Sequence, residues 1–127
     1  MRMAIVGCGY VADFYMRTLK NYPQLEVAGV MDRDPERLSR FAGHFGVPAI
    51  GSLEEITDDG SIQLVVNLTN PRSHFGVSKA CLEAGKHVYS EKPLALDLRE
   101  AEHLVELAEQ SNLLLASAPC TVLGESA

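Results

Sequence analysis

The first residues of the chain that could do chemistry form a glycine turn. The turn has the spacing G-x-G-x-x-A and consists of Gly7, Cys8, Gly9, Tyr10, Val11 and Ala12. In this spacing the first glycine permits a tight turn, the second lets the backbone approach a pyrophosphate, and the third small residue lets a helix pack closely on a strand. The first N–H groups of such a helix attract phosphate oxygens. Residues 7 and 9–12 are therefore candidates for binding a dinucleotide.

An acidic residue follows the second apolar run of the sequence. Asp32 lies at about the 20-residue offset expected for an acid that accepts hydrogen bonds from the adenosine ribose hydroxyls. A carboxylate at this position repels a 2′-phosphate, which favours NAD over NADP. Arg33 comes next, and its guanidinium could instead pair with that phosphate. The sequence therefore predicts NAD as the cofactor and keeps NADP as the alternative.

A different class of nucleotide site also has glycines after its first strand and an acid after its second. S-adenosylmethionine methyltransferases share these features, but their turn usually contains a further glycine where this chain has Val11. They also commonly carry an acid late in the first strand, where this chain has the apolar residues 4–6. Both differences favour the dinucleotide interpretation.

The segments that must position these groups alternate between strand and helix patterns. Apolar runs predict strands at residues 3–6, 25–31, 48–50, 62–68, 87–89 and 113–116. This alternation is typical of a mostly parallel sheet with helices on both faces. We therefore predict an α/β fold, a Rossmann-type doubly wound parallel sheet of about six strands in three αβα layers with the order 3-2-1-4-5-6.

Residues with capping preferences indicate where the helices between these strands begin and end. N-caps are predicted at Asp34, Ser52, Asn70 and Asp97, and helix ends at Gly46 and Gly85. The first helix is predicted at residues 11–21. Its apolar spacing predicts an inward face formed by Val11, Phe14, Tyr15, Thr18 and Leu19.

Composition and charge exclude several classes of function. The chain has 127 residues and a formal net charge of −6, and its basic residues do not cluster as a nucleic-acid or anionic-membrane surface requires. No apolar run approaches the roughly 20 residues of a membrane span. The cysteines and histidines show no metal-ligand spacing, so no metal is expected. We expect a single cytoplasmic domain.

Two segments in the second half carry a more specific pattern than the glycine turn. Residues 67–74 read Asn-Leu-Thr-Asn-Pro-Arg-Ser-His, and residues 84–95 read Ala-Gly-Lys-His-Val-Tyr-Ser-Glu-Lys-Pro-Leu-Ala. Together with the glycine turn they resemble the Gfo/Idh/MocA family of NAD(P)-dependent oxidoreductases over essentially the whole chain. Members of that family act mainly on sugars, cyclitols and related alcohols or carbonyls.

The resemblance implies roles for residues in both segments. The lysine of the family's E-K-P element corresponds to Lys92, whose ammonium could hydrogen-bond a nicotinamide-ribose or substrate oxygen and steady charge at the reacting carbon. Lys92 is therefore the predicted catalytic residue. Glu91 could orient Lys92 or pack near the nicotinamide, and Pro93 stiffens the turn. Contacts with the ribose and nicotinamide side of the cofactor are implied for Thr69, Asn70, Pro71 and His74.

The resemblance also implies that the chain is part of a larger enzyme. Residues 1–118 are expected to form the NAD(P)-binding domain. Residues 119–127 are expected to begin the connection to a missing α+β domain that holds most of a sugar-like substrate and often the contacts of a homo-oligomer. We expect hydride transfer between the nicotinamide and a secondary alcohol or its ketone, with this chain binding cofactor but turning over little or no substrate. The alternative is a nucleotide-sensing or regulatory module that uses the same pocket without catalysis.

Overall fold

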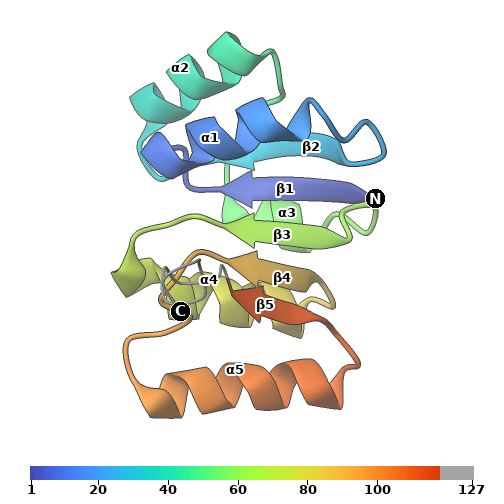
Figure 1. Ribbon diagram of the computed structural model, residues 1–127, viewed down its shortest axis with the longest axis vertical. Coiled ribbons are helices and arrows are strands. Elements are labelled where there is room, and N and C mark those ends of the chain that lie inside the picture. Colours follow the sequence, from blue (N-terminus) through green and yellow to red (C-terminus); the bar gives the residue numbers. More distant parts are fainter. Residues whose placement is uncertain (118–127) are drawn as a thin grey trace, which may run out of the picture.

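Five parallel strands among residues 1–117 form the central sheet (Figure 1). They are Arg2–Val6 (β1), Glu26–Met31 (β2), Leu64–Asn67 (β3), His87–Ser90 (β4) and Leu115–Ser117 (β5). The structure, a computed structural model, describes residues 1–117, so the connection predicted for residues 119–127 lies outside them. The strand order is β2-β1-β3-β4-β5. This is the predicted Rossmann-type order without its outermost strand.

The strand predicted at residues 48–50 is reduced to a single parallel bridge between Val30 and Ala49. The N–H of Val30 donates to the Pro48 carbonyl at 3.0 Å, and the N–H of Ile50 donates to the Val30 carbonyl at 2.7 Å. Pro48 has no N–H of its own and cannot extend a ladder of hydrogen bonds. Five of the six predicted strands are therefore present in residues 1–117, and the segment at residues 48–50 is the one that is not.

Five helices within residues 1–117 connect these strands. They are Tyr10–Leu19 (α1), Pro35–Phe45 (α2), Leu53–Thr57 (α3), Pro71–Glu83 (α4) and Leu98–Gln110 (α5). The predicted N-caps are confirmed, because N–H groups in the first turns of α2 to α5 donate to the side chains of Asp34, Ser52, Asn70 and Asp97. Across residues 1–117, no helix has both the length and the apolar character needed to cross a membrane.

The helices cover both faces of the sheet and complete the three predicted layers. Met3 and Ile5 of β1 pack with residues of α1 and α2 in one core cluster. Ala4 and Val6 point to the other face, where they pack with residues of α3, α4 and α5. β1 is thus buried on both faces, which explains why residues 3–6 are continuously apolar.

The inward face of α1 differs from the predicted one. Of the five residues predicted to face inward, Tyr15 and Leu19 pack partly against the core, whereas Val11, Phe14 and Thr18 are exposed. Ala12 and Met16 are the buried residues of this helix. The glycine turn brings α1 close to the sheet, where a small side chain such as that of Ala12 fits, and this contact fixes the rotation of the helix.

All strands end at the same edge of the sheet, where their arrowheads point in one direction (Figure 1). β1 and β3 are neighbours, but the helices that follow them, α1 and α4, lie on opposite faces. Open α/β sheets bind ligands at such a switch point, beyond the carboxyl ends of the strands. Residues 7–12, 32–33, 69–74 and 91–92, which the sequence singles out, all lie on loops or helix starts at this edge.

Candidate functional site

The two glycines of the turn have different surroundings. Gly7 has a φ of +100°, and a Cβ atom there would lie 2.5 Å from the carbonyl oxygen of Leu68, just after β3. Only glycine suits this backbone conformation and this close approach. At Gly9 a Cβ atom would meet no other atom of residues 1–117 within 4 Å. Gly7 therefore packs the turn against the next strand, while Gly9 leaves open space beside the backbone.

The first turn of α1 has no side-chain cap. Gly9 is its N-cap residue, and within residues 1–117 no side chain accepts a hydrogen bond as the cap of this helix. The N-caps of α2, α4 and α5 are all polar residues whose side chains accept such bonds. The first N–H groups of α1 and the positive end of its dipole thus adjoin the open space at Gly9. Phosphate oxygens are acceptors that suit this position.

Asp32 connects the glycine turn to the loop after β2. Its Oδ2 accepts a hydrogen bond from the N–H of Cys8, and its Oδ1 accepts one from the N–H of Asp34, both at 2.8 Å. Nη1 of Arg37 lies 3.6 Å from Oδ2, and the Asp32 side chain is 9% exposed. A carboxylate offers about four acceptor positions. Asp32 can therefore still accept a hydrogen bond from a donor such as a ribose hydroxyl.

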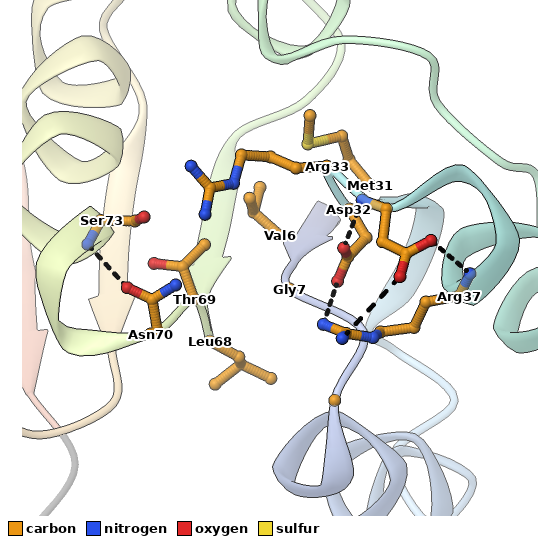
Figure 2. Close-up of a pocket in the computed structure, with 12 residues that line it drawn as sticks. Val6, Gly7, Met31, Asp32, Arg33, Arg37, Leu68, Thr69, Asn70 and Ser73 are labelled. Atoms are coloured by element: carbon orange, nitrogen blue, oxygen red, sulfur yellow. Dashed lines mark hydrogen bonds and ion pairs between the residues drawn. The ribbon is translucent and has the colours of Figure 1, made fainter.

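A cavity of about 460 Å³ lies beside these residues, within the range of roughly 300–1,000 Å³ that is typical of small-molecule sites (Figure 2). It is lined from the ends of β1, β2 and β3 and the starts of α2 and α4 by Val6, Gly7, Gly9, Met31, Asp32, Arg33, Asp34, Arg37, Leu68, Thr69, Asn70 and Ser73. Figure 2 shows Arg33 extending toward Thr69 and Ser73, with Arg37 on the opposite side.

The cavity brings together six residues predicted to contact a cofactor: Gly7, Gly9, Asp32, Arg33, Thr69 and Asn70. Asp34, Arg37 and Ser73 also line it, although the sequence did not single them out as ligand contacts. Each lies at the cap or in the first turn of a helix that follows a predicted site residue, and this proximity is the only signal that could have found them. Pro71 lines an adjoining hollow with Arg33.

The other predicted residues of the glycine turn do not line the cavity with their side chains. Tyr10 is 78% exposed, Val11 is also exposed, and Ala12 is buried against the sheet. The exposed pair Tyr10 and Phe14 pack edge to face, with ring centroids 5.0 Å apart. A role of Tyr10, Val11 and Ala12 in phosphate binding therefore depends on their backbone N–H groups.

A buried asparagine connects the loops after β3 and β4. Nδ2 of Asn67 donates to Oγ of Ser78 at 2.9 Å and to the carbonyl of His74 at 3.0 Å, while its Oδ1 accepts from the hydroxyl of Thr69 at 2.6 Å. The Asn67 carbonyl accepts from the N–H of Glu91 at 3.0 Å. Asn67 is the first residue of the segment 67–74 that resembles the family, but no role was predicted for it. A polar residue ending an apolar strand was the available signal.

The E-K-P element forms the loop after β4. The hydroxyl of Tyr15 donates to Oε2 of Glu91 at 3.2 Å, Lys92 is exposed, and the Lys92–Pro93 peptide bond is cis. Burial raises the pKa of the Tyr15 hydroxyl, and the nearby hydroxyl of Tyr89 and carboxylate of Glu91 raise it further. Tyr15 therefore stays protonated and can donate to Glu91.

His74 lies behind this loop and not on the cavity wall. Its side chain is buried, Nε2 is 2.7 Å from the carbonyl oxygen of Thr69, and Nδ1 faces the carbonyl oxygen of Pro93. Both ring nitrogens thus face the protein backbone. This arrangement differs from the direct cofactor contact predicted for His74.

The cysteine of the glycine turn is not activated. Burial, followed by the charge of the Asp32 carboxylate, raises the pKa of the Cys8 thiol to about 12. Burial also raises the pKa of the Cys81 thiol, on the other side of the sheet, to about 12. Because the thiolate is the reactive form, neither residue is a nucleophile at neutral pH. No three His, Cys, Asp or Glu side chains in residues 1–117 are grouped as a metal site.

The fold and this edge together define a class of protein. A parallel αβα sheet, a glycine turn before a helix without a side-chain cap, and a carboxylate after the second strand are the features of a dinucleotide-binding domain. Comparison with known families then identifies the family. Residues 1–118 match GFO_IDH_MocA, the oxidoreductase family with an NAD-binding Rossmann fold. The chain belongs to this Gfo/Idh/MocA family and comprises its nucleotide-binding domain.

Similar curated proteins include several dehydrogenases. The chain is 31% identical over 116 residues to UDP-N-acetylglucosamine 3-dehydrogenase of Acidithiobacillus ferrooxidans, a match that covers 91% of this chain and 36% of that protein. It is 32% identical over 121 residues to trans-1,2-dihydrobenzene-1,2-diol dehydrogenase of Mus musculus, covering 93% and 36%. The chain therefore spans about a third of the length of these relatives.

Solved structures with the same fold include proteins bound to either cofactor. GenD2 from gentamicin A biosynthesis, in complex with NAD, superposes with a TM-score of 0.88 at 28% identity, over 93% of this chain and 34% of that one. Biliverdin reductase from Synechocystis, in complex with biliverdin and NADP+, gives a TM-score of 0.86 at 31% identity, over 91% and 37%.

Proposed function

We propose that the chain binds the adenosine and pyrophosphate portions of NAD(P) between the glycine turn and the loop after β3. The observation that carries this proposal is the first turn of α1, which adjoins open space at Gly9 and has no cap from a side chain of residues 1–117. The pyrophosphate would accept hydrogen bonds from the N–H groups of this turn. The adenosine ribose would donate to Asp32, and Thr69 and Asn70 would form the opposite wall.

The nicotinamide portion is proposed to lie at the loop after β4, where Lys92 is exposed. When bound, NAD(P) supplies a carbon that accepts or donates a hydride. The ammonium of Lys92 would donate a hydrogen bond to an oxygen of the nicotinamide ribose or of the substrate and stabilise negative charge there. Glu91, held by Tyr15, would keep the start of this loop in place.

We propose NAD as the preferred cofactor. The Asp32 carboxylate lies where a 2′-phosphate would have to approach, and like charges repel. Arg37 is already paired with Asp32, at 3.6 Å. Arg33 extends into the cavity and is therefore the guanidinium that would favour NADP (Figure 2).

For the whole protein we propose hydride transfer between this cofactor and a sugar, cyclitol or related secondary alcohol or ketone. Relatives named UDP-N-acetylglucosamine 3-dehydrogenase and myo-inositol 2-dehydrogenase support this substrate class. Residues 1–118 would be the cofactor domain, and the chain beyond them would lead to the part that holds the substrate and joins the subunits of a homo-oligomer. The present chain should therefore bind cofactor but turn over little or no substrate. Appreciable sugar dehydrogenase activity would contradict this division of roles.

The test is a titration of the chain with NADH and, separately, with NADPH, followed by the emission of the cofactor because the chain contains no tryptophan. We expect saturable NADH binding that weakens about tenfold in Asp32→Ala, since one charge-assisted hydrogen bond is lost. Asp97→Ala, which removes the N-cap of α5, is the matched control and should bind NADH as the wild type does.

The NADPH titration separates the two cofactors. We expect weaker binding of NADPH than of NADH, improved by Asp32→Ala and worsened by Arg33→Ala. Tighter binding of NADPH to the wild type would reverse the proposed preference. Binding of neither cofactor, with thermal unfolding showing an intact fold, would overturn the proposed site.

A further inference from the structure

A buried histidine lies between two loops at the carboxyl edge of the sheet. His74, in the first turn of α4, is 1% exposed. Its Nε2 lies 2.7 Å from the carbonyl oxygen of Thr69 in the loop after β3, and its Nδ1 faces the carbonyl oxygen of Pro93 in the loop after β4. One side chain therefore joins the backbones of two loops that follow neighbouring strands.

These contacts matter because both acceptors are backbone carbonyls beside a buried ring. Both contacts are part-buried, so a carbonyl that loses its donor here loses a hydrogen bond that water replaces only in part. A neutral imidazole has one N–H and can donate to one of the carbonyls, whereas an imidazolium can donate to both. An apolar side chain at position 74 would leave both carbonyls without this partner.

The two loops depend on His74 to different degrees. Thr69 is also held by Asn67, whose Oδ1 accepts hydrogen bonds from the Thr69 N–H and hydroxyl. In the loop after β4, Glu91 is held by the Asn67 carbonyl and by the hydroxyl of Tyr15, both on the side before Lys92. The contact with His74 is made on the other side, at Pro93. Lys92 thus lies between two points of attachment, and the second is His74.

We propose that His74 is a positioning residue for the nicotinamide half of the cofactor site, which it serves by holding the Lys92–Pro93 segment against the loop after β3. This inference rests on the proposed function, which assigns Lys92 to the nicotinamide side. The adenosine half is formed by the glycine turn, Asp32, the start of α2 and, on the opposite wall, Thr69 and Asn70. His74 contacts the Thr69 carbonyl of this half, but Asn67 still holds Thr69 when His74 is lost. Loss of His74 should therefore affect one half of the site and spare the other.

The experiment compares the affinities for NADH and for ADP, which lacks both the nicotinamide and its ribose, in the 127-residue chain and its variants. His74→Leu removes both ring nitrogens at similar volume. We expect it to weaken NADH binding about tenfold and to change ADP binding less than about twofold. His74→Gln keeps a donor that can reach one carbonyl, and its loss of NADH affinity should be intermediate.

Ser78→Ala is the matched control, because it removes another hydrogen bond of the same buried group, from Nδ2 of Asn67, one turn further along α4. We expect it to lower the stability without changing the ratio of the two affinities. A parallel loss of both ligands in His74→Leu, or no loss of either, would overturn the positioning role.

Amide hydrogen exchange gives a second readout that needs no cofactor. His74→Leu should speed exchange in residues 91–96, and Ser78→Ala should not. Unchanged exchange there would contradict the attachment of this loop by His74. Failure of the wild type to bind either NADH or ADP would overturn the proposed function, and the exchange data would still decide whether His74 holds the loop.

Discussion

At the scale of single residues, the two glycines of the turn differ in whether the fold has room for a Cβ atom at their position. Gly7 combines a positive φ with a carbonyl oxygen 2.5 Å from the position of a Cβ atom. Gly7→Ala should therefore lower the free energy of unfolding by about 2–4 kcal/mol, the sum of the left-handed backbone cost and an overlap with backbone atoms. Urea denaturation of the variant and the wild type measures this difference.

Gly9→Ala provides the contrast. Its Cβ atom would meet open space, so the free energy of unfolding should stay within about 0.5 kcal/mol of the wild type. The added methyl group would occupy the space proposed for the pyrophosphate, so NADH binding should fall strongly. Equal destabilisation by the two alanines, or unchanged NADH binding in Gly9→Ala, would contradict the different roles given to these glycines.

Whether a residue of the site could be predicted from the sequence depends on how far along the chain its partners lie. Asp32 could be predicted because the acid after the second strand is defined by order along the chain alone. Arg37 was missed because it reaches Asp32 from the first turn of α2, which depends on helix geometry. The motif pointed to His74, but its contact with Pro93 spans 19 residues and two elements. No local pattern indicates which way such a ring faces.

At the scale of elements, the sequence predicted most strands and all four helix caps, because these depend on short apolar runs and local hydrogen bonds. The predictions differ from the structure where tertiary packing determines how a segment pairs or which face of a helix is buried. The segment at residues 48–50 has strand-like residues but only a bridge to Val30. The rotation of α1 follows from the close approach of Ala12 to the sheet, which the apolar spacing of a ten-residue helix does not reveal.

The caps of α4 and α5 permit a prediction at this scale. Asn70 and Asp97 both accept a hydrogen bond from an N–H in the first turn of their helix, at 3.2 and 2.9 Å. Replacing either by alanine should lower the free energy of unfolding by about 1 kcal/mol. Only Asn70 lines the cavity. Asn70→Ala should therefore also weaken NADH binding, whereas Asp97→Ala should not, as denaturation and titration of both variants would show. Equal effects on binding would remove Asn70 from the site.

At the scale of the whole molecule, the sheet is covered on both faces and each core cluster contains a buried thiol, Cys8 in one and Cys81 in the other. Burial raises the pKa of each thiol from 9.0 to about 12. A group whose pKa is raised by folding contributes its full stabilisation below its unfolded pKa, here pH 9. That contribution is lost as the pH rises toward 12, because the unfolded chain releases the proton first.

The free energy of unfolding should therefore fall as the pH rises above 9, by about 1.4 kcal/mol per pH unit for each thiol. The formal net charge of −6 becomes more negative over the same range and adds to the loss. Urea denaturation at a series of alkaline pH values measures the slope. Cys81→Ala should be less stable at neutral pH but should show a shallower fall above pH 9. Identical slopes would show that the buried thiol of Cys81 does not carry this dependence.

The position of β1 has a consequence for biosynthesis. Of the five strands in residues 1–117, β1 leaves the ribosome first, and in the finished sheet it has β2 on one side and β3 on the other. β2 is made next and pairs with one free edge of β1. β3 then pairs with the other edge of β1, and β4 and β5 extend the sheet on that side, each beside the strand made before it. None of these five strands has to insert between two that are already paired, so the nascent chain can extend the sheet outward as translation proceeds.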